Sequence, residues 1–233
     1  MDQQLSSPIG PLFPEASTEM GRRALPKIDA SISLDRHLFA VEDLEGMFQP
    51  DSYFPAEQPL VLEVGCGKGL FLRNSAVGRP KLNFIGIEIA KKYASYCAHQ
   101  LVRRELSNAI MFQGDGQRFV REHAVRGTFQ EVHVYFPDPW WKARHRKRRV
   151  LNETMLKGIE TILSVGGEFH FWTDVQEYFD VTLELIPEVT NLRGPLDVVE
   201  AAPDHDMDYR THFERRMRQA DKPIYRSLFL KQD

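Results

Sequence analysis

Short apolar segments that end in glycine and are followed by helix-length stretches constrain the fold of this chain most. The first is LVLEV (60–64), which runs directly into GCGKG (65–69). A continuous apolar run of this length is typical of a parallel strand buried on both faces. The alternation recurs toward the C-terminus, so the sequence predicts an α/β fold with a mostly parallel sheet and helices on both faces.

The apolar runs place the expected elements along the chain. We expect strands at 60–64, 83–88, 109–113, 131–136 and 167–173, with later strands near 196–199 and 224–231. The expected helices end at about residue 76 or span about 90–105, 117–124, 150–163 and 175–186. Ligands of such sheets bind beyond the carboxyl ends of the strands, so the residues that follow these strands are the candidates for function.

The first 58 residues differ from the rest in composition. Residues 1–20 carry Pro8, Pro11 and Pro14 without a hydrophobic period, which predicts a flexible tail. Residues 21–58 mix charge and proline with scattered apolar side chains, and we expect an N-terminal extension packed on the core, with a short helix. Residues 59–233 then form the main domain.

Charge and cysteine content exclude several classes of protein. The net charge is −3 and the isoelectric point is near 6.3, so a general nucleic-acid coat is excluded and any contact with a polyanion must be local. Two cysteines, Cys66 and Cys97, cannot form a disulfide framework, which favours a cytoplasmic location. The N-terminus lacks a cationic start followed by an apolar core, and no run of eighteen apolar residues occurs, so we expect neither a signal peptide nor membrane association.

The turn after the first strand carries glycine at positions 65, 67 and 69. Glycines at this place let the backbone turn tightly and approach a ligand closely, and Gly65 and Gly67 are therefore candidate cofactor-binding residues. A nicotinamide cofactor would use the same arrangement, but its fingerprint needs a glycine where this chain has Leu70. A tight turn without a ligand is the simplest alternative.

Three carboxylates stand at the ends of the first three strands. Glu63 precedes the glycine turn, Glu88 ends the second strand and Asp115 follows the third. A carboxylate at the position of Glu88 typically binds ribose hydroxyls. An acid before the turn suits a ligand with a positive end, such as the ammonium and sulfonium of S-adenosylmethionine, and Asp115 suits the adenine amino group. Singly, Glu63 and Asp115 are also typical of a solvated acid and a helix cap.

The fourth strand ends in an acidic and aromatic corner. Pro137 and Pro139 stiffen the backbone around Asp138, and Trp140 and Trp141 can stack on a base drawn out of its surroundings. Indoles that cap the core are the alternative. A cationic run follows without an acid inside it, which favours contact with phosphate: Lys142, Arg144, Arg146, Lys147, Arg148 and Arg149.

In this order and spacing, the motifs resemble those of the bacterial tRNA (guanine-N7-)-methyltransferases, which modify the guanine at position 46 of the tRNA variable loop. The resemblance covers the chain from about residue 60 to the C-terminus. It rests on LEVGCGKG, GIEIA, GDG, FPDPWWKARHRKRR, Trp172-Thr173-Asp174 and Thr211-His212-Phe213-Glu214. The last motif usually has Tyr where this chain has Phe213, and residues 21–58 do not show the family's Arg/Gly-rich pattern clearly.

The resemblance implies a fold, a cofactor and a substrate. The fold is the Rossmann-like class I methyltransferase, with a mostly parallel seven-stranded sheet and residues 59–233 as the catalytic domain. The cofactor is S-adenosylmethionine and the partner is tRNA, with no metal, as a monomer or homodimer. The resemblance places Glu63, Glu88, Asp115 and Asp138 on the cofactor, with Asp138 also in the catalytic position. Facing the guanine it places Lys142, Asp174, Thr211, His212, Phe213 and Glu214.

The chemistry of the target atom sets the expected mechanism. Guanine N7 has a lone pair and no proton, so transfer needs alignment more than a general base. We assign Asp138 to stabilising the positive charge that develops on the purine. Asp174 could accept hydrogen bonds from guanine N1–H and the N2 amino group, although a strand-end cap is the alternative.

Other functions remain open on the sequence alone. Asp-Pro-Trp is similar to the Asp-Pro-Pro-aromatic motif of N6-adenine enzymes, so an amino-methyltransferase acting on another RNA base is one rival. A non-catalytic RNA-binding module that lost the cofactor is another. The segment 204–208, DHDMD, begins like a calcium loop but has Tyr209 where that loop needs glycine, and we interpret it as a solvated loop.

Overall fold

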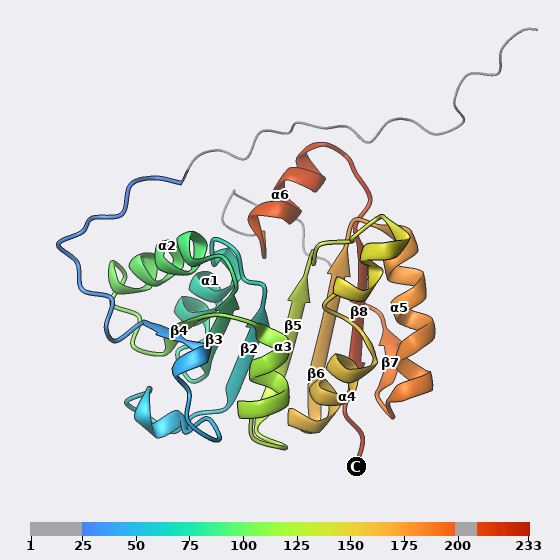
Figure 1. The fold of residues 1–233 in the computed structure, drawn as a ribbon, viewed down its shortest axis with the longest axis horizontal. Helices are drawn as coiled ribbons and strands as arrows, with labels where there is room; N and C mark the ends of the chain where they lie inside the picture. Colours follow the sequence, from blue (N-terminus) through green and yellow to red (C-terminus); the bar gives the residue numbers. More distant parts are fainter. Residues whose placement is uncertain (1–24, 199–208) are drawn as a thin grey trace, which may run out of the picture.

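The computed structural model describes residues 25–198 and 209–233 (Figure 1). The expected tail, residues 1–20, and the segment 204–208 lie outside these residues. Five parallel strands form the centre of the sheet: β2 (Leu60–Val64), β3 (Asn83–Glu88), β4 (Ala109–Gln113), β5 (Phe129–Tyr135) and β6 (Leu163–Thr173). These strands confirm the elements expected from the apolar runs.

The order of the strands creates a crevice at the centre of the sheet. The sheet has eight strands in the order β1-β4-β3-β2-β5-β6-β8-β7. The chain moves outward from β2 through β3 to β4 and then returns to the other side of β2 with β5. Such a reversal leaves the carboxyl ends of β2 and β5 free of a crossing connection, and ligands bind there. At the far edge, β8 (Tyr225–Leu230) is antiparallel to β6, and β7 (Arg193–Leu196) is antiparallel to β8.

The N-terminal segment before β2 differs from two expectations. The resemblance implied seven strands, but β1 (Leu38–Ala40) adds a parallel strand next to β4. The short helix expected within 21–58 is wrong for the described part, residues 25–58, which forms β1 and two 3-10 turns, Val41–Asp43 and Pro50–Ser52. Gly46, Pro50 and Pro55 interrupt any helical run there. Val41 and Phe48 of this segment are buried in the core.

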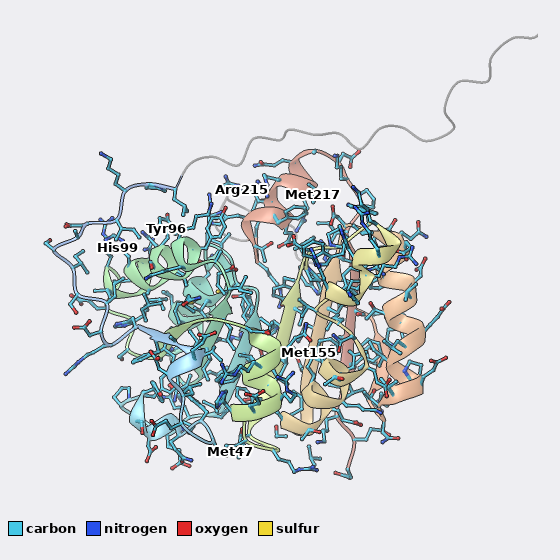
Figure 2. The ribbon with its side chains drawn as sticks, in the orientation of Figure 1. Met47, Tyr96, His99, Met155, Arg215 and Met217 are labelled. Carbon is cyan, nitrogen blue, oxygen red and sulfur yellow. The ribbon has the colours of Figure 1, made fainter. Side chains whose placement is uncertain are left out.

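Helices cover both faces of the sheet and one lies above it (Figure 1). Side chains of α1 (Leu70–Gly78) and α2 (Lys91–Val102) pack on one face. The opposite face carries α3 (Gly116–Arg118) with the π-turn Phe119–His123, α4 (Glu153–Ile162) and α5 (Gln176–Val189). A sixth helix, α6 (His212–Gln219), lies above the carboxyl ends of the strands, where Arg215 and Met217 mark it in Figure 2.

Two late elements differ from expectation. The strand expected near 196–199 is found at Arg193–Leu196, so it ends where it was expected to begin, and it pairs there with β8. Helix α6 was not expected as an element. Its sequence, HFERRMRQ, contains only two apolar side chains, so no hydrophobic stripe announces it.

Candidate active site

Two adjoining cavities open at the carboxyl ends of β2, β3, β4 and β5. They share five lining residues, Gly65, Gly67, Tyr93, Tyr135 and Phe136. The larger, of about 510 Å³, is lined also by three of the expected acids and is called the acidic cavity: Glu88, Asp115 and Asp138. The smaller, of about 210 Å³, lies under α6 and is called the basic cavity, after Lys68, His212 and Arg216 in its wall. Because the two cavities share a wall, one ligand could reach into both.

The glycine turn forms the floor between the cavities. Gly65, Gly67 and Gly69 have φ angles of 77°, 55° and 67°, a region that side chains other than glycine rarely adopt. A Cβ added at Gly65 or Gly67 would meet nothing within 4 Å, so a ligand can approach the backbone there. At Gly69 a side chain is excluded by packing, since a Cβ would lie 2.0 Å from Cys97 Sγ.

Glu88 ties the turn to the end of β3. Its Oε2 accepts a hydrogen bond from Gly67 N at 2.9 Å, and its Oε1 accepts one from Ala90 N at 2.8 Å. Each carboxylate oxygen has a further lone pair, so Glu88 can also accept from the hydroxyls of a ribose in the acidic cavity. The expected position of Glu88 in the cavity wall is therefore supported by its geometry.

Glu63 is a buried acid in the wall of the basic cavity. Burial raises the pKa of its carboxyl well above the usual range, the charge of Glu88 adds to this effect, and a backbone hydrogen bond from Leu72 opposes it. Its Oε2 is buried and has no hydrogen-bond partner among the described residues. A buried oxygen without a partner is costly, and a ligand that donates a hydrogen bond or brings positive charge would satisfy it.

Asp115 has the local role that its position predicted. It is the N-cap of α3, and its Oδ1 accepts from Gln117 N at 2.8 Å. The side chain stays exposed at the rim of the acidic cavity, beside Gln117, whose Oε1 accepts from Asn152 Nδ2 at 3.0 Å. A cap leaves one oxygen of Asp115 available to a ligand.

The corner after β5 is strained on both sides of Asp138. Phe136 and Trp140 have φ angles of 49° and 47°, which cost about 1–3 kcal/mol each for residues with a side chain. Such strain is typical of functional sites, and here it holds the exposed Asp138 at the wall of the acidic cavity. Phe136 also contacts Phe213 of α6, with ring centroids 4.8 Å apart.

The two tryptophans of this corner differ in exposure. Trp140 is half-buried, with the Arg148 guanidinium 5.0 Å from its ring centroid and His145 at its edge. Trp141 is 64% exposed. Trp141 therefore keeps the free face that stacking on a base requires, whereas Trp140 already packs against the basic segment.

The basic segment forms a 3-10 turn, Ala143–Arg148, and most of its cations are exposed. Arg149 is the exception, at 6% exposed. It donates to Pro139 O at 2.9 Å, forms an ion pair with Glu177 of α5, and lies 4.4 Å from the ring centroid of Tyr178. These contacts clamp the corner to α5, and they argue against the phosphate role expected for Arg149. Arg146 also pairs with Glu177, at 3.2 Å.

Helix α6 brings three of the four residues of the last motif to the basic cavity. Thr211, His212 and Phe213 line it, and Thr211 caps the helix by accepting from Glu214 N at 2.9 Å. Glu214 points inward instead: it is 2% exposed and accepts from Arg210 N at 2.7 Å. This burial argues against a guanine contact for Glu214 and gives it a capping role.

Asp174 stands apart from both cavities. It follows β6, is half-buried, and lines neither cavity. Burial raises the pKa of its carboxyl, while a backbone hydrogen bond and Lys222 oppose the shift. Lys142 is exposed at the start of the basic segment and also lies outside the cavity walls.

The structure adds residues that sequence reasoning missed. Tyr93, Tyr135 and Phe136 form the shared wall, and Lys68 and Arg216 charge the basic cavity. Tyr135 and Phe136 end an expected strand, which was a usable signal. The sequence does not single out Tyr93 or Arg216. Both lie on helices, α2 and α6, and they reach the cavity only because of how these helices pack on the sheet.

A buried polar chain on β5 supports the shared wall. Arg79 donates to Glu131 Oε1 at 2.6 Å, and His133 lies between Glu131 Oε2 at 2.9 Å and the Tyr135 hydroxyl at 2.8 Å. Arg210 donates to the same hydroxyl at 3.0 Å. A neutral His133 that donates from Nε2 and accepts at Nδ1 satisfies every member of the chain. Tyr135 thus links the cavity wall to Arg210, two residues before α6.

These hydrogen-bonded side chains predict that the stability of the protein depends on pH. Burial lowers the pKa of His133 to about 3, His170 adds to the effect and Glu131 opposes it. An unfolded histidine binds a proton near pH 6.5 and folded His133 does not, so stability falls as the pH drops from about 6.5 toward 3. Between pH 6.5 and 5.5, the free energy of unfolding of His133→Phe should therefore fall by about 1 kcal/mol less than that of wild type. Urea unfolding of both proteins at the two pH values measures this, and parallel losses would contradict it.

Comparison with known proteins relates this site to enzymes. Residues 57–227 match the model of a family described as putative methyltransferase. A tRNA (guanine-N(7)-)-methyltransferase of Rhodopirellula baltica is 45% identical over 225 residues, covering 94% of this chain and 83% of the relative. The chain belongs to the tRNA (guanine-N(7)-)-methyltransferase family. A member from Colwellia psychrerythraea is 33% identical over 172 residues, covering 74% of this chain and 70% of the relative.

Solved structures confirm the class I methyltransferase fold. The aminoglycoside resistance methyltransferase NpmB1 superposes with a TM-score of 0.57 at 16% identity, covering 83% of this chain and 98% of that one. The 16S rRNA methyltransferase KamB gives a TM-score of 0.58 at 13% identity, with coverages of 84% and 99%. The relatives and the family model confirm the tRNA (guanine-N(7)-)-methyltransferase resemblance drawn from the motifs, and the chain is a methyltransferase. No helix in the described residues is long and apolar enough to cross a membrane.

Proposed function

We propose that this protein transfers a methyl group from S-adenosylmethionine to N7 of guanine at position 46 in the variable loop of tRNA. The observation that carries the proposal is the acidic cavity with Asp138 in its wall, next to an exposed tryptophan and a cationic segment. The relatives named above as tRNA (guanine-N(7)-)-methyltransferases support the substrate and the target atom. A tRNA substrate and two buried free cysteines favour a cytoplasmic location.

The residues present fit the cofactor. Open space in front of Gly65 and Gly67 admits a ligand close to the backbone, and the free Oε2 of Glu63 suits an ammonium group. Glu88 and Asp115 in the acidic cavity suit the ribose hydroxyls and the adenine amino group. S-adenosylmethionine, when bound, supplies an electrophilic methyl group on a positively charged sulfur.

Asp138 carries the chemical role in the proposed reaction. Guanine N7 has no proton to remove, so the enzyme must align the base and stabilise the positive charge that the purine acquires. Asp138 is exposed at the cavity wall, and the backbone on either side of it is strained. The Trp141 ring is available to stack on the base.

Asp174 has a proposed role in reading the base. Its carboxylate would accept from guanine N1–H and N2, donors that adenine does not offer together. We expect Asp174→Ala to lower kcat/KM for tRNA methylation by about tenfold to a hundredfold, as loss of a charged hydrogen bond does, with the Kd for S-adenosylhomocysteine unchanged. Steady-state kinetics and calorimetry measure the two quantities. An equal loss in both would remove Asp174 from base recognition.

The basic segment divides into phosphate-binding and structural cations. We propose that Lys142, Arg144, Arg146, Lys147 and Arg148 contact the RNA backbone. Arg144→Met is expected to reduce the slope of log K against log salt for tRNA by about 1, with stability within about 0.5 kcal/mol of wild type. Arg149→Met is expected to lower the free energy of unfolding by about 2 kcal/mol, because it removes a buried hydrogen bond and a cation–π contact. Salt titrations and urea unfolding test the pair, and an unchanged salt slope for Arg144→Met would contradict it.

Two unmodified tRNA transcripts test the function itself. One carries guanine at position 46 and the other adenine, and each is incubated with the protein and S-adenosylmethionine labelled in the methyl group. We expect label in the guanine transcript alone. Label in both transcripts would show that the methylated base is not guanine 46, as expected of an amino-methyltransferase that acts on another base. A protein that binds the cofactor and labels neither transcript would contradict the proposal.

A further inference from the structure

The charge of the two cavities is opposite in sign. In the acidic cavity, Glu88, Asp115 and Asp138 face one cation, Arg148. In the basic cavity, Lys68, Arg216 and the titratable His212 face one acid among the described residues, the buried Glu63. A concave site with an excess of positive charge favours an anionic ligand group. The expected ribose and adenine contacts do not account for that group.

Helix α6 supplies two of these three side chains. Arg216 is half-buried, and its guanidinium lies 5.1 Å from the ring centroid of Phe213, which also lines the cavity. Its Nε is buried and has no hydrogen-bond partner among the described residues. The arginine is thus held at the cavity by an aromatic ring while part of its donor capacity is unused, which is the state expected of a side chain that awaits an acceptor.

His212 stands in the same field. Burial, together with the charges of Arg73, Lys68, Arg215 and Arg216, lowers its pKa to about 4, so the ring is neutral at neutral pH. A neutral imidazole still donates one N–H. Lys68 enters from the other side, on the glycine turn, so the cationic side chains come from two separate segments of the chain.

The chemistry of the cofactor names the anion. The methionine end of S-adenosylmethionine carries its ammonium and its carboxylate on the same carbon atom. If Glu63 accepts from the ammonium, the carboxylate must also lie within the basic cavity. We propose that Lys68, His212 and Arg216 bind this carboxylate, so that the bound cofactor joins α6 to the glycine turn. The inference rests on the proposed function for the identity of the cofactor.

The consequence is a link between the cofactor and the substrate side of the site. Thr211, the N-cap of α6, and Phe213 are among the residues expected to face the guanine, and they adjoin the side chains that would hold the carboxylate. Cofactor binding would therefore fix α6 before the base enters. Arg210, two residues before α6, donates to the Tyr135 hydroxyl, so the N-terminal end of the helix already has one anchor and the carboxylate would add a second.

Two matched ligands isolate the carboxylate. S-adenosylhomocysteine has it, and 5′-deoxy-5′-(3-aminopropylthio)adenosine keeps the ammonium but lacks it. We expect calorimetry of the full-length protein to show tighter binding of the first by about tenfold or more, as for a charge-assisted hydrogen bond. Arg216→Met should raise the Kd for S-adenosylhomocysteine by about tenfold and keep the Kd for the decarboxylated ligand within about twofold of the wild-type value. Lys68→Met should act in the same way. Arg126→Met, which removes an exposed cation that lines neither cavity, should change neither affinity.

Hydrogen exchange gives the second readout. In wild type, the amides of 213–219 should exchange more slowly with S-adenosylhomocysteine than with the decarboxylated ligand, and Arg216→Met should remove that difference. Unchanged affinity for both ligands in Arg216→Met and Lys68→Met, with a raised KM for tRNA, would assign the cations to an RNA phosphate and overturn the proposal. An equal loss for both ligands would overturn it as well. The titrations contain no tRNA, so a failure of guanine methylation would leave the measured ligand affinities, and what they say of the carboxylate, unchanged.

Discussion

Replacing Asp138 by alanine is expected to lower kcat for tRNA methylation by about a hundredfold to a thousandfold, the range seen when one electrostatic stabiliser of a transition state is removed. The reason is that the purine becomes positively charged during transfer, and among the described residues Asp138 is the acid at the cavity wall next to the basic segment and the exposed Trp141. Single-turnover kinetics with saturating tRNA measure the effect.

The side effects of this change should be small. Asp138 is exposed, so the free energy of unfolding should stay within about 0.5 kcal/mol of wild type. The Kd for S-adenosylhomocysteine should rise by no more than about tenfold, the value of one exposed hydrogen bond to a charged group. Asp138→Asn keeps the shape of the side chain and separates charge from size. If Asp138→Ala retains more than a tenth of the wild-type rate, the electrostatic role is wrong.

Replacing Glu88 by alanine is expected to weaken cofactor binding by about a hundredfold or more. Glu88 holds the amides of Gly67 and Ala90, so its loss removes both a contact to the ribose and the support of the glycine turn. Glu88→Gln should also be defective, because its amide NH₂ would face one of the two N–H donors. Calorimetry with S-adenosylhomocysteine measures the loss.

Glu57→Ala is the matched control for this prediction. Glu57 is an exposed acid outside both cavities, and its removal changes the net charge by the same amount. The Kd of this variant should equal that of wild type. A Glu88→Ala protein that binds the cofactor within about threefold of wild type would show that the carboxylate is not part of the cofactor site.

The parts of the fold that sequence could predict are those with a local signal. Strand β2 is apolar apart from Glu63 because both of its faces are buried, and this pattern is visible in the sequence. The acids at the carboxyl ends of β2, β3 and β4 could be grouped because parallel strands end at one edge of the sheet. Strand β1 is only three residues long, and its pairing depends on the free edge of β4, which no local pattern announces.

The roles that sequence could not predict depend on distant partners. Arg149 reads as one more cation in a basic run, and its burial follows from Glu177 and Tyr178, which lie on α5. Glu214 reads as part of a substrate motif, and its inward direction follows from Arg210 N and from the cap at Thr211. The spacing of Thr211 and Glu214 was a capping-box signal, so the start of α6 could have been found from sequence.

The position of the new methyl group on the RNA decides whether the protein is the enzyme proposed. Wild-type protein is incubated with S-adenosylmethionine and unmodified tRNA, the RNA is cut into fragments by a ribonuclease, and fragments and nucleosides are analysed by mass spectrometry. We predict 7-methylguanosine in the fragment that contains position 46 and no other new methylated nucleoside. A methyl group on an exocyclic amine, or 7-methylguanosine only in other fragments, would contradict the proposed function.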